Sequence, residues 1–244
     1  MKRIPLTINS HVIHLRKYVT GNKPSIILIH GLGVSGDYYL TYAKKLEPFF
    51  DVYIIDLPGY GKTPKPKSPL TIQALSNIVT AFVSSNDLKK SIIVGQSMGC
   101  QIVCHAVVNS PDLFSKALLL APTTNKNERS VAMQSVRLFQ DTLHESLKIN
   151  AIVFLNYARM GVRRFLITAN FMVNDHIEEV IKHINIPVLI VSGSQDKIAP
   201  KAWAKYLAKN APDAQAIEIQ KAPHLLQYQK PEELVRITRE FTQV

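Results

Sequence analysis

The chain has 244 residues, of which 46% are hydrophobic and 19% are charged. This composition supplies enough apolar side chains for one large domain with a buried core, so it excludes an intrinsically disordered chain. The formal net charge is +11, but the Lys and Arg residues are spread along the chain and form no nucleic-acid-binding motif, which argues against a nucleic acid as partner.

The amino-terminal residues 1–18 have a basic start but lack the apolar segment of a secretory signal, and no apolar run of the chain approaches the length of a transmembrane helix. Cys100 and Cys104 lie four residues apart on one predicted helix, a spacing that neither orients a disulfide nor completes a metal site. We therefore expect a cytoplasmic protein with two buried free thiols and no stable membrane insertion.

The first predicted element is an antiparallel hairpin in residues 5–18, with its turn at Asn9 and Ser10. After it, short continuous apolar runs alternate with segments of helical periodicity. Continuous apolarity is typical of strands buried on both faces, and the alternation predicts a mostly parallel sheet covered by helices. The strands are expected at 25–30, 52–56, 91–95, 116–121, 187–193 and 216–220, and the helices at 37–47, 71–85, 98–109, 200–210 and 231–242.

The loop after the first of these parallel strands reads His-Gly-Leu-Gly and contains His30. Gly31 and Gly33 allow the loop to pass close to a second glycine-rich turn later in the chain. This approach brings the backbone N–H of Leu32 beside that of Met98, and two such donors form an oxyanion hole. His30 is expected to brace the loop.

The second glycine-rich turn holds Ser97 between Gly95 and Gly99, where a predicted strand becomes a helix. A sharp turn of this kind exposes the serine hydroxyl and strains its backbone, so the residues two positions away must lack side chains. The helix beginning at Met98 points its free N–H groups at the place where negative charge develops during acyl transfer. The pattern predicts a nucleophile rather than an ordinary turn serine.

The alternation of strands and helices stops between Pro122 and Pro187, where the sequence has helical periodicity and no convincing strand. We expect an insertion of helices between two strands of the sheet. Its apolar side chains have two interpretations: they line a pocket for a hydrophobic acyl or aromatic substrate, or the helices bury them in ordinary packing. These side chains are Phe139, Leu143, Phe154, Leu155, Tyr157, Met160, Phe165, Phe171 and Met172.

The same insertion contains three arginines, Arg159, Arg163 and Arg164. Their expected role is contact with solvent, and the alternative is binding of a substrate carboxylate.

A serine nucleophile needs a base and an orienting acid, both from strand ends on the same side of the sheet. Asp196 follows the next-to-last predicted strand, and His224 lies in the loop after the last one. The chain order Ser97, Asp196, His224 is the order expected for a triad on such a sheet. Because aspartate is also common in turns, an acid from the segment containing Glu128 is left open.

Five motifs occur in order along the chain: HGLG at 30–33, DLPGYGKT at 56–63, GQSMG at 95–99, SGSQD at 192–196 and APHLLQYQKPEEL at 222–234. With these motifs the chain resembles the α/β-hydrolase superfamily over nearly its full length. The resemblance implies an eight-stranded, mostly parallel sheet, with residues 1–121 and 187–244 as the core domain and residues 122–186 as a helical lid. It also implies the triad and oxyanion roles given above, and a loop-fixing role for Asp56.

The predicted activity is that of a serine hydrolase that cleaves a carboxylic ester through an acyl-enzyme on Ser97. Its partner is then a small, apolar ester or acyl compound, and the reaction requires no metal or organic cofactor. Serine at the turn argues against the haloalkane dehalogenases and epoxide hydrolases of this fold, which use aspartate there. Two alternatives remain: a carbon–carbon bond hydrolase of the meta-cleavage type, and a hydrolase-like receptor that binds a small molecule with little turnover.

Overall fold

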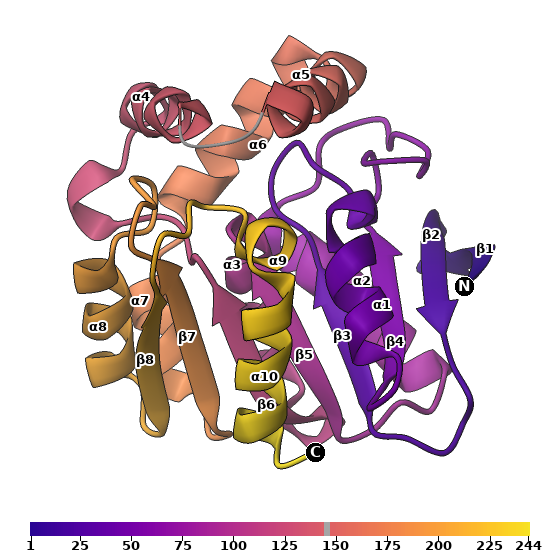
Figure 1. Cartoon of the computed structure of the whole chain (residues 1–244). Helices are drawn as coiled ribbons and strands as arrows, with labels where there is room; N and C mark the ends of the chain where they lie inside the picture. Colours follow the sequence, from indigo (N-terminus) through magenta and orange to yellow (C-terminus); the bar gives the residue numbers. More distant parts are fainter. Residues whose placement is uncertain (144–146) are drawn as a thin grey trace.

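The centre of the molecule is an eight-stranded sheet, which the computed structural model shows between layers of helices (Figure 1). The structure describes residues 1–143 and 147–244. In sheet order the strands are β1 (Lys2–Ile8), β2 (His11–Tyr18), β4 (Asp51–Asp56), β3 (Ser25–Ile29), β5 (Ser91–Gln96), β6 (Phe114–Leu120), β7 (Val188–Gly193) and β8 (Ala214–Ile219). Neighbours from β4 to β8 pair in parallel, whereas β2 pairs antiparallel with β1 and β4. The predicted eight-stranded, mostly parallel sheet is confirmed.

The predicted hairpin at the amino terminus consists of β1 and β2. Its two turn residues, Asn9 and Ser10, have φ angles of +47° and +64°. Both angles lie in the left-handed region, and a two-residue turn with this conformation matches the right-handed twist of the strands that it joins. Asparagine adopts the conformation more readily than most residues, which is why the sequence located the turn.

The inner strands are continuously apolar because helices cover the sheet on both faces. Residues 26–29 of β3, 92–94 of β5 and 118–120 of β6 are all buried. In Figure 1, α10 (Pro231–Thr242) crosses in front of the sheet and α3 (Met98–Asn109) lies behind it. A strand between two such layers has no polar face to present to water, so its sequence does not alternate.

The other core helices follow the predicted helical segments. They are α1 (Leu40–Leu46), α2 (Ile72–Ser85) and α8 (Lys201–Asn210). The structure adds the short α9 (Leu226–Gln229), which was not predicted, and 3-10 helices at Gly36–Tyr39 and Pro111–Leu113. In α2, Leu75, Val79 and Phe82 recur at helical spacing and are buried, and the Thr71 hydroxyl caps the helix by accepting a hydrogen bond from the Ala74 N–H at 3.2 Å. In the described part of the chain, none of the helices combines the length and apolarity needed to cross a membrane.

A group of helices lies between β6 and β7 in the chain, in residues 122–186, and we call this segment the insertion. It comprises α4 (Val131–Thr142), α5 (Leu147–Met160), α6 (Val162–Asn174) and α7 (Ile177–Val180), with 3-10 helices at Lys126–Glu128 and Ile181–His183. The described residues of the insertion form no strand, as the periodicity predicted. In Figure 1, α4, α5 and α6 lie above the carboxyl ends of the parallel strands, the edge at which ligands bind in open α/β sheets.

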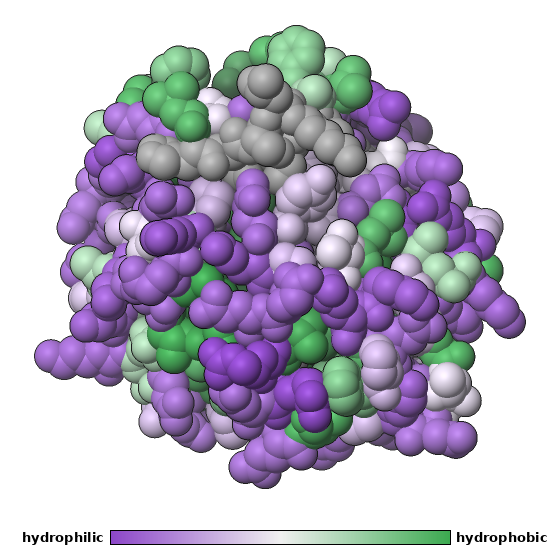
Figure 2. All heavy atoms as spheres, viewed as in Figure 1, coloured by the Kyte–Doolittle hydropathy of each residue, from purple (hydrophilic) through white to green (hydrophobic). Residues whose placement is uncertain are grey.

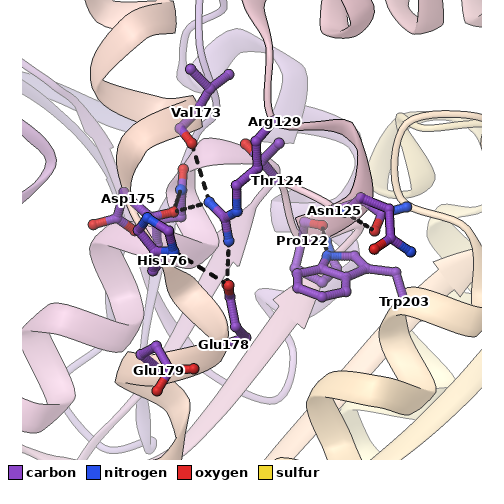
Figure 3. Close-up of polar contacts among 12 residues, drawn as sticks. Pro122, Thr124, Asn125, Arg129, Val173, Asp175, His176, Glu178, Glu179 and Trp203 are labelled. Atoms are coloured by element: carbon purple, nitrogen blue, oxygen red, sulfur yellow. Dashed lines mark hydrogen bonds and ion pairs between the residues drawn. The ribbon is translucent and has the colours of Figure 1, made fainter.

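The two ends of the insertion are held together by Arg129 (Figure 3). Its guanidinium donates hydrogen bonds to the carbonyls of Val173 and Asp175, at 3.1 and 3.0 Å, and forms an ion pair with Glu178. On the core side, the Trp203 indole N–H donates to the Pro122 carbonyl at 3.0 Å. Trp203 is buried. The insertion is therefore tied to the sheet layer at its first residue and closed on itself near its last helix.

Candidate active site

Ser97 occupies the sharp turn between β5 and α3. Its φ and ψ angles are +56° and −122°, a conformation that residues with side chains rarely adopt. A Cβ atom at Gly95 would meet the Gly99 backbone, and one at Gly99 would meet the Ile29 carbonyl. Both glycines are thus required by close backbone approach, for the reason that the sequence analysis gave.

Asp196 and His224 come from the loops that follow β7 and β8. His224 Nδ1 lies 2.9 Å from Asp196 Oδ2, and the two residues are only 6% and 4% exposed. The second carboxylate oxygen, Asp196 Oδ1, accepts hydrogen bonds from the Ile198 and Ala199 N–H groups at 2.8 and 2.9 Å. With a proton on Nδ1 shared with the carboxylate, His224 keeps the lone pair of Nε2 for a second partner. Asp196 is therefore the acid that contacts the imidazole ring of His224.

Glu128, the alternative acid, faces a different partner. It forms an ion pair with Arg137 of α4, so its carboxylate is engaged within the insertion. No contact between Glu128 and His224 occurs in the described structure, and the alternative acid receives no support.

One cavity joins Ser97 and His224 beneath the insertion. Its volume is about 80 Å³. The residues that the core contributes to its wall include Gly31, Leu32, Gln96, Ser97 and His224. Those that the insertion contributes include Val131, Gln134, Asp141, Asn150, Tyr157, Phe165 and Met172. Hydrophobic side chains make up about half of the lining residues. The core and the insertion both contribute polar side chains to the rest of the wall. This composition is typical of a small-molecule site with a few orienting polar groups.

The loop of residues 30–33 passes directly beside the serine turn. A Cβ atom at Gly31 would lie 2.9 Å from Ser97 Cβ and 2.9 Å from Gln96 Oε1, so only glycine allows this approach. At Gly33, with φ of +72°, a side chain would meet the ring of Tyr157 from α5. The two glycines therefore seat the loop between the serine turn and the insertion.

His30 ties this loop to the end of β4. The Leu57 N–H donates to His30 Nε2 at 3.1 Å, and His30 Nδ1 lies 2.8 Å from the Gly31 carbonyl oxygen. Full burial lowers the pKa of His30, so the ring is neutral and carries its proton on Nδ1, where it donates to that carbonyl. The contacts are those of a bracing side chain.

Leu32 and Met98, the predicted oxyanion donors, belong to the two segments that meet at the serine turn. Met98 is the first residue of α3, so its N–H has no acceptor within the helix and marks the positive end of the helix dipole. Leu32 follows Gly31 and lines the cavity together with Ser97. Both backbone N–H groups are thus carried by segments adjacent to the serine turn.

Asp56 fixes the loop that follows β4. Its buried carboxylate forms an ion pair with Arg16 at 2.6 Å and accepts a hydrogen bond from the Gly36 N–H at 2.7 Å. The Lys62 N–H also approaches it, at 3.4 Å. Asp56 does not line the cavity with Ser97. The predicted structural role of this residue agrees with these contacts.

Cys100 and Cys104 are free and buried, as predicted. Burial raises the pKa of both thiols, so neither is a thiolate at neutral pH. Cys100 Sγ lies 3.2 Å from the Gly95 carbonyl oxygen, inside the turn rather than in the cavity. In the described residues, no group of three or more His, Cys, Asp or Glu side chains is arranged to hold a metal ion.

The insertion side chains do not behave as one set. Tyr157, Phe165 and Met172 line the cavity, and Met160 and Phe171 pack against the core. Neither interpretation holds for the other four, which are exposed to solvent and do not line the cavity. These four are Phe139, Leu143, Phe154 and Leu155.

The three insertion arginines also differ. Arg159 and Arg163 are exposed, as expected, whereas Arg164 is half-buried and donates a hydrogen bond to the Pro66 carbonyl at 2.6 Å. None of the three lines the cavity with Ser97. These three arginines are therefore not placed to bind a substrate carboxylate beside Ser97.

Several polar cavity residues were missed by the sequence analysis. Asp141, on α4, is buried, and its Oδ1 accepts a hydrogen bond from the His224 N–H at 3.2 Å. Thr123 Oγ1 and Asn150 Oδ1 are buried cavity oxygen atoms without a hydrogen-bond partner in the described structure. The place of these residues in the cavity wall depends on how α4 and α5 pack on the core. No local sequence motif predicts that packing.

Asp141 is expected to stabilise the loop that carries His224. In Asp141→Ala the His224 N–H loses its acceptor in a buried position, which should lower the free energy of unfolding by about 1–3 kcal/mol. Asp141→Asn keeps an oxygen acceptor and should lose less than half as much. Urea denaturation of the two variants measures the difference, and equal losses would show that the charge of Asp141 matters instead of this hydrogen bond.

Comparison with known proteins agrees with this architecture. Residues 24–166, more than half of the chain, match the model of a protein family described as having the alpha/beta hydrolase fold. Among curated proteins, the chain is 23% identical over 252 residues to the uncharacterized hydrolase YugF of Bacillus subtilis, covering 93% of this chain and 92% of that protein. It is 22% identical over 230 residues to the pimeloyl-(acyl-carrier protein) methyl ester esterase of Vibrio campbellii, covering 84% and 89%.

Solved structures show the same fold. A thermophilic esterase from Thermogutta terrifontis superposes with a TM-score of 0.83 at 17% identity, covering 100% of this chain and 98% of that one. The enol-lactonase from Burkholderia xenovorans LB400 superposes with a TM-score of 0.85 at 18% identity, covering 99% and 100%. At these identities the similarity shows only that the elements are arranged in the same way. Any conclusion about the reaction has to come from the residues of the site.

Proposed function

The chain belongs to the family of proteins with the alpha/beta hydrolase fold, and we propose that it is a serine hydrolase that cleaves small carboxylic esters. The observation that carries the proposal is the buried contact of 2.9 Å between His224 Nδ1 and Asp196 Oδ2, with His224 on the same cavity as Ser97. A strained serine, an imidazole on its cavity and a buried carboxylate behind that imidazole are the parts of a nucleophile, base and orienting acid.

In the proposed reaction, the Ser97 hydroxyl oxygen attacks the ester carbonyl while His224 Nε2 takes its proton. Asp196 holds the imidazole in the tautomer that leaves Nε2 unprotonated, and it stabilises the imidazolium that forms. His224 then returns the proton to the departing alcohol, which leaves an acyl group on Ser97. Water, deprotonated by the same imidazole, attacks this ester and releases the acid.

The Leu32 and Met98 N–H groups are the proposed donors to the oxyanion in both steps. Each such donor contributes about 3 kcal/mol to the stability of the transition state when it is fixed before the reaction. Gly31 and His30 serve these donors indirectly, since they set the position of the loop that carries Leu32. The reaction needs no metal or organic cofactor.

The proposed domain arrangement is a core of residues 1–121 and 187–244 with the insertion as a lid over the site. Its support is the cavity wall, to which both the core and the insertion contribute. The curated relatives named as methyl ester esterases support an ester as the substrate class. The cavity of about 80 Å³ is smaller than the roughly 150 Å³ that holds a benzene molecule in an apolar protein cavity, which favours a short acyl group.

Hydrolysis of p-nitrophenyl acetate, butyrate, hexanoate and octanoate tests the proposal. We expect turnover at neutral pH, unchanged by a metal chelator, with the highest kcat/KM for acetate or butyrate because longer chains exceed the cavity. An optimum at octanoate would contradict the short-acyl preference. No turnover of any ester by folded protein would contradict ester hydrolysis and favour a carbon–carbon bond hydrolase or a small-molecule receptor.

A further inference from the structure

The outer face of the insertion is unusually apolar. Twelve large apolar side chains are exposed in the described part of the chain, and eight of them belong to residues 133–166. We call these eight side chains the insertion patch: Met133, Val136, Phe139, Leu143, Phe154, Leu155, Val162 and Leu166. Phe139, Leu143 and Phe154 are 67%, 72% and 72% exposed, so they point away from the core rather than resting on it. Figure 2 shows apolar residues gathered at this end of the molecule.

The patch is separate from the cavity with Ser97, because none of its eight side chains lines that cavity. In Figure 1, α4 and α5 form the outermost layer of the molecule above the sheet. The cavity with Ser97 lies on the inner side of these helices and is lined by other side chains, such as Tyr157 and Met172. The eight side chains come from α4, α5, α6 and the residue after α4, and a set spread over several helices suits a broad, deformable apolar layer.

Positive charge borders the insertion patch. Arg159 and Arg163 are exposed beside Leu155 and Val162 in the chain. The loop with Lys62, Lys65 and Lys67 lies close to them, because Lys65 and Arg159 line one surface hollow and Arg164 donates its hydrogen bond to Pro66 in that loop. The three lysines are exposed.

Negative charge is sparse on this face. In residues 131–166 the sequence has only Asp141 and Glu145 as acidic residues. Asp141 is buried against the His224 loop, and Glu145 lies outside the described residues. Exposed apolar side chains bordered by arginine and lysine are the combination by which a protein binds the headgroup region of an anionic lipid layer.

We propose that the insertion patch docks peripherally on an anionic lipid surface. The apolar side chains enter the headgroup region, and the bordering arginines and lysines contact lipid phosphates. A second copy of this chain is a weaker match, since two such faces would bring like charges together in a protein of net charge +11. The proposal concerns where the protein binds and does not depend on the proposed ester hydrolysis.

Sedimentation with vesicles of phosphatidylcholine containing 30% phosphatidylglycerol, compared with phosphatidylcholine alone, tests the docking. We expect wild type to bind the anionic vesicles at least about tenfold more tightly at low salt, with the difference lost at high salt. Phe139→Ser with Phe154→Ser, and separately Arg159→Gln with Arg163→Gln, should each weaken binding by about tenfold or more.

Matched controls carry the same changes on other surfaces. Val12→Ser with Val19→Ser removes two exposed apolar side chains near the amino-terminal hairpin, and Lys205→Gln with Lys209→Gln removes two charges from α8. Both should bind within about twofold of wild type if the insertion patch is the docking surface.

Three outcomes would overturn the proposal: no binding of wild type to the anionic vesicles, equal losses in the control variants, or unchanged binding by Phe139→Ser with Phe154→Ser. A concentration-dependent dimer that this variant abolishes, without vesicle binding by wild type, would assign the patch to a second copy instead. Because the readout is sedimentation, inactivity toward esters would leave the docking result unchanged.

Discussion

Replacement of Ser97 by alanine is expected to lower kcat for p-nitrophenyl butyrate by about 100,000-fold or more. The variant keeps the loop donors and the His224–Asp196 contact but lacks the oxygen atom on which the acyl group would be carried. Methyl in place of hydroxyl removes no hydrogen bond of the turn itself, which is held by the Ser97 N–H to the Leu120 carbonyl at 2.9 Å. The loss should therefore be one of activity with little change in stability.

Ser135→Ala is the matched control for this substitution. Ser135 lines the same cavity from α4, and its hydroxyl donates to the Val131 carbonyl at 2.8 Å. The control also removes a serine hydroxyl from the cavity wall, and it should keep activity within about threefold of wild type. Diethyl p-nitrophenyl phosphate should transfer its diethylphosphoryl group to the Ser97 oxygen of wild type and Ser135→Ala, with release of p-nitrophenol, but should leave Ser97→Ala unmodified. Mass spectrometry of the intact protein measures the added group. Activity of Ser97→Ala within tenfold of wild type would point to another nucleophile.

The sequence predicted the parts of the site that depend on local backbone geometry. Ser97 between Gly95 and Gly99 was recognisable because a strand, a strained turn and a helix follow one another within a few residues. Asp196 and His224 were recognisable because parallel strands end at one edge of the sheet, so residues just beyond those ends lie near one another. The described strands and core helices agree with the predicted ranges to within a few residues for the same reason.

The sequence did not predict which residues of the insertion contribute to the site. Asp141 is one polar residue near the end of an amphipathic helix, and only the docking of α4 places it against the His224 N–H. The exposure of Phe139 and Phe154 was missed because an apolar side chain on a helix is normally evidence of burial. Periodicity marks the apolar face of a helix but does not say what covers it.

Asp196→Asn is expected to lower kcat by about 10,000-fold while keeping the fold. The reason lies in the backbone around the carboxylate. The Ile198 and Ala199 N–H groups donate to Oδ1, so an asparagine must place its amide oxygen there. Its NH₂ group then faces His224 Nδ1, which has to act as an acceptor. The proton moves to Nε2, and the imidazole no longer takes the proton of Ser97.

The same mechanism predicts the activity of a double variant. Since Asp196 acts only through His224 and Ser97, the double variant Ser97→Ala with Asp196→Asn should be no less active than Ser97→Ala alone. Asp213→Asn, the same change on the exposed loop before β8, should leave kcat within about twofold of wild type. If Asp196→Asn lost less than about tenfold in kcat, the tautomer of His224 would be set by another residue, and the carboxylate contact at 2.9 Å would have only a structural role.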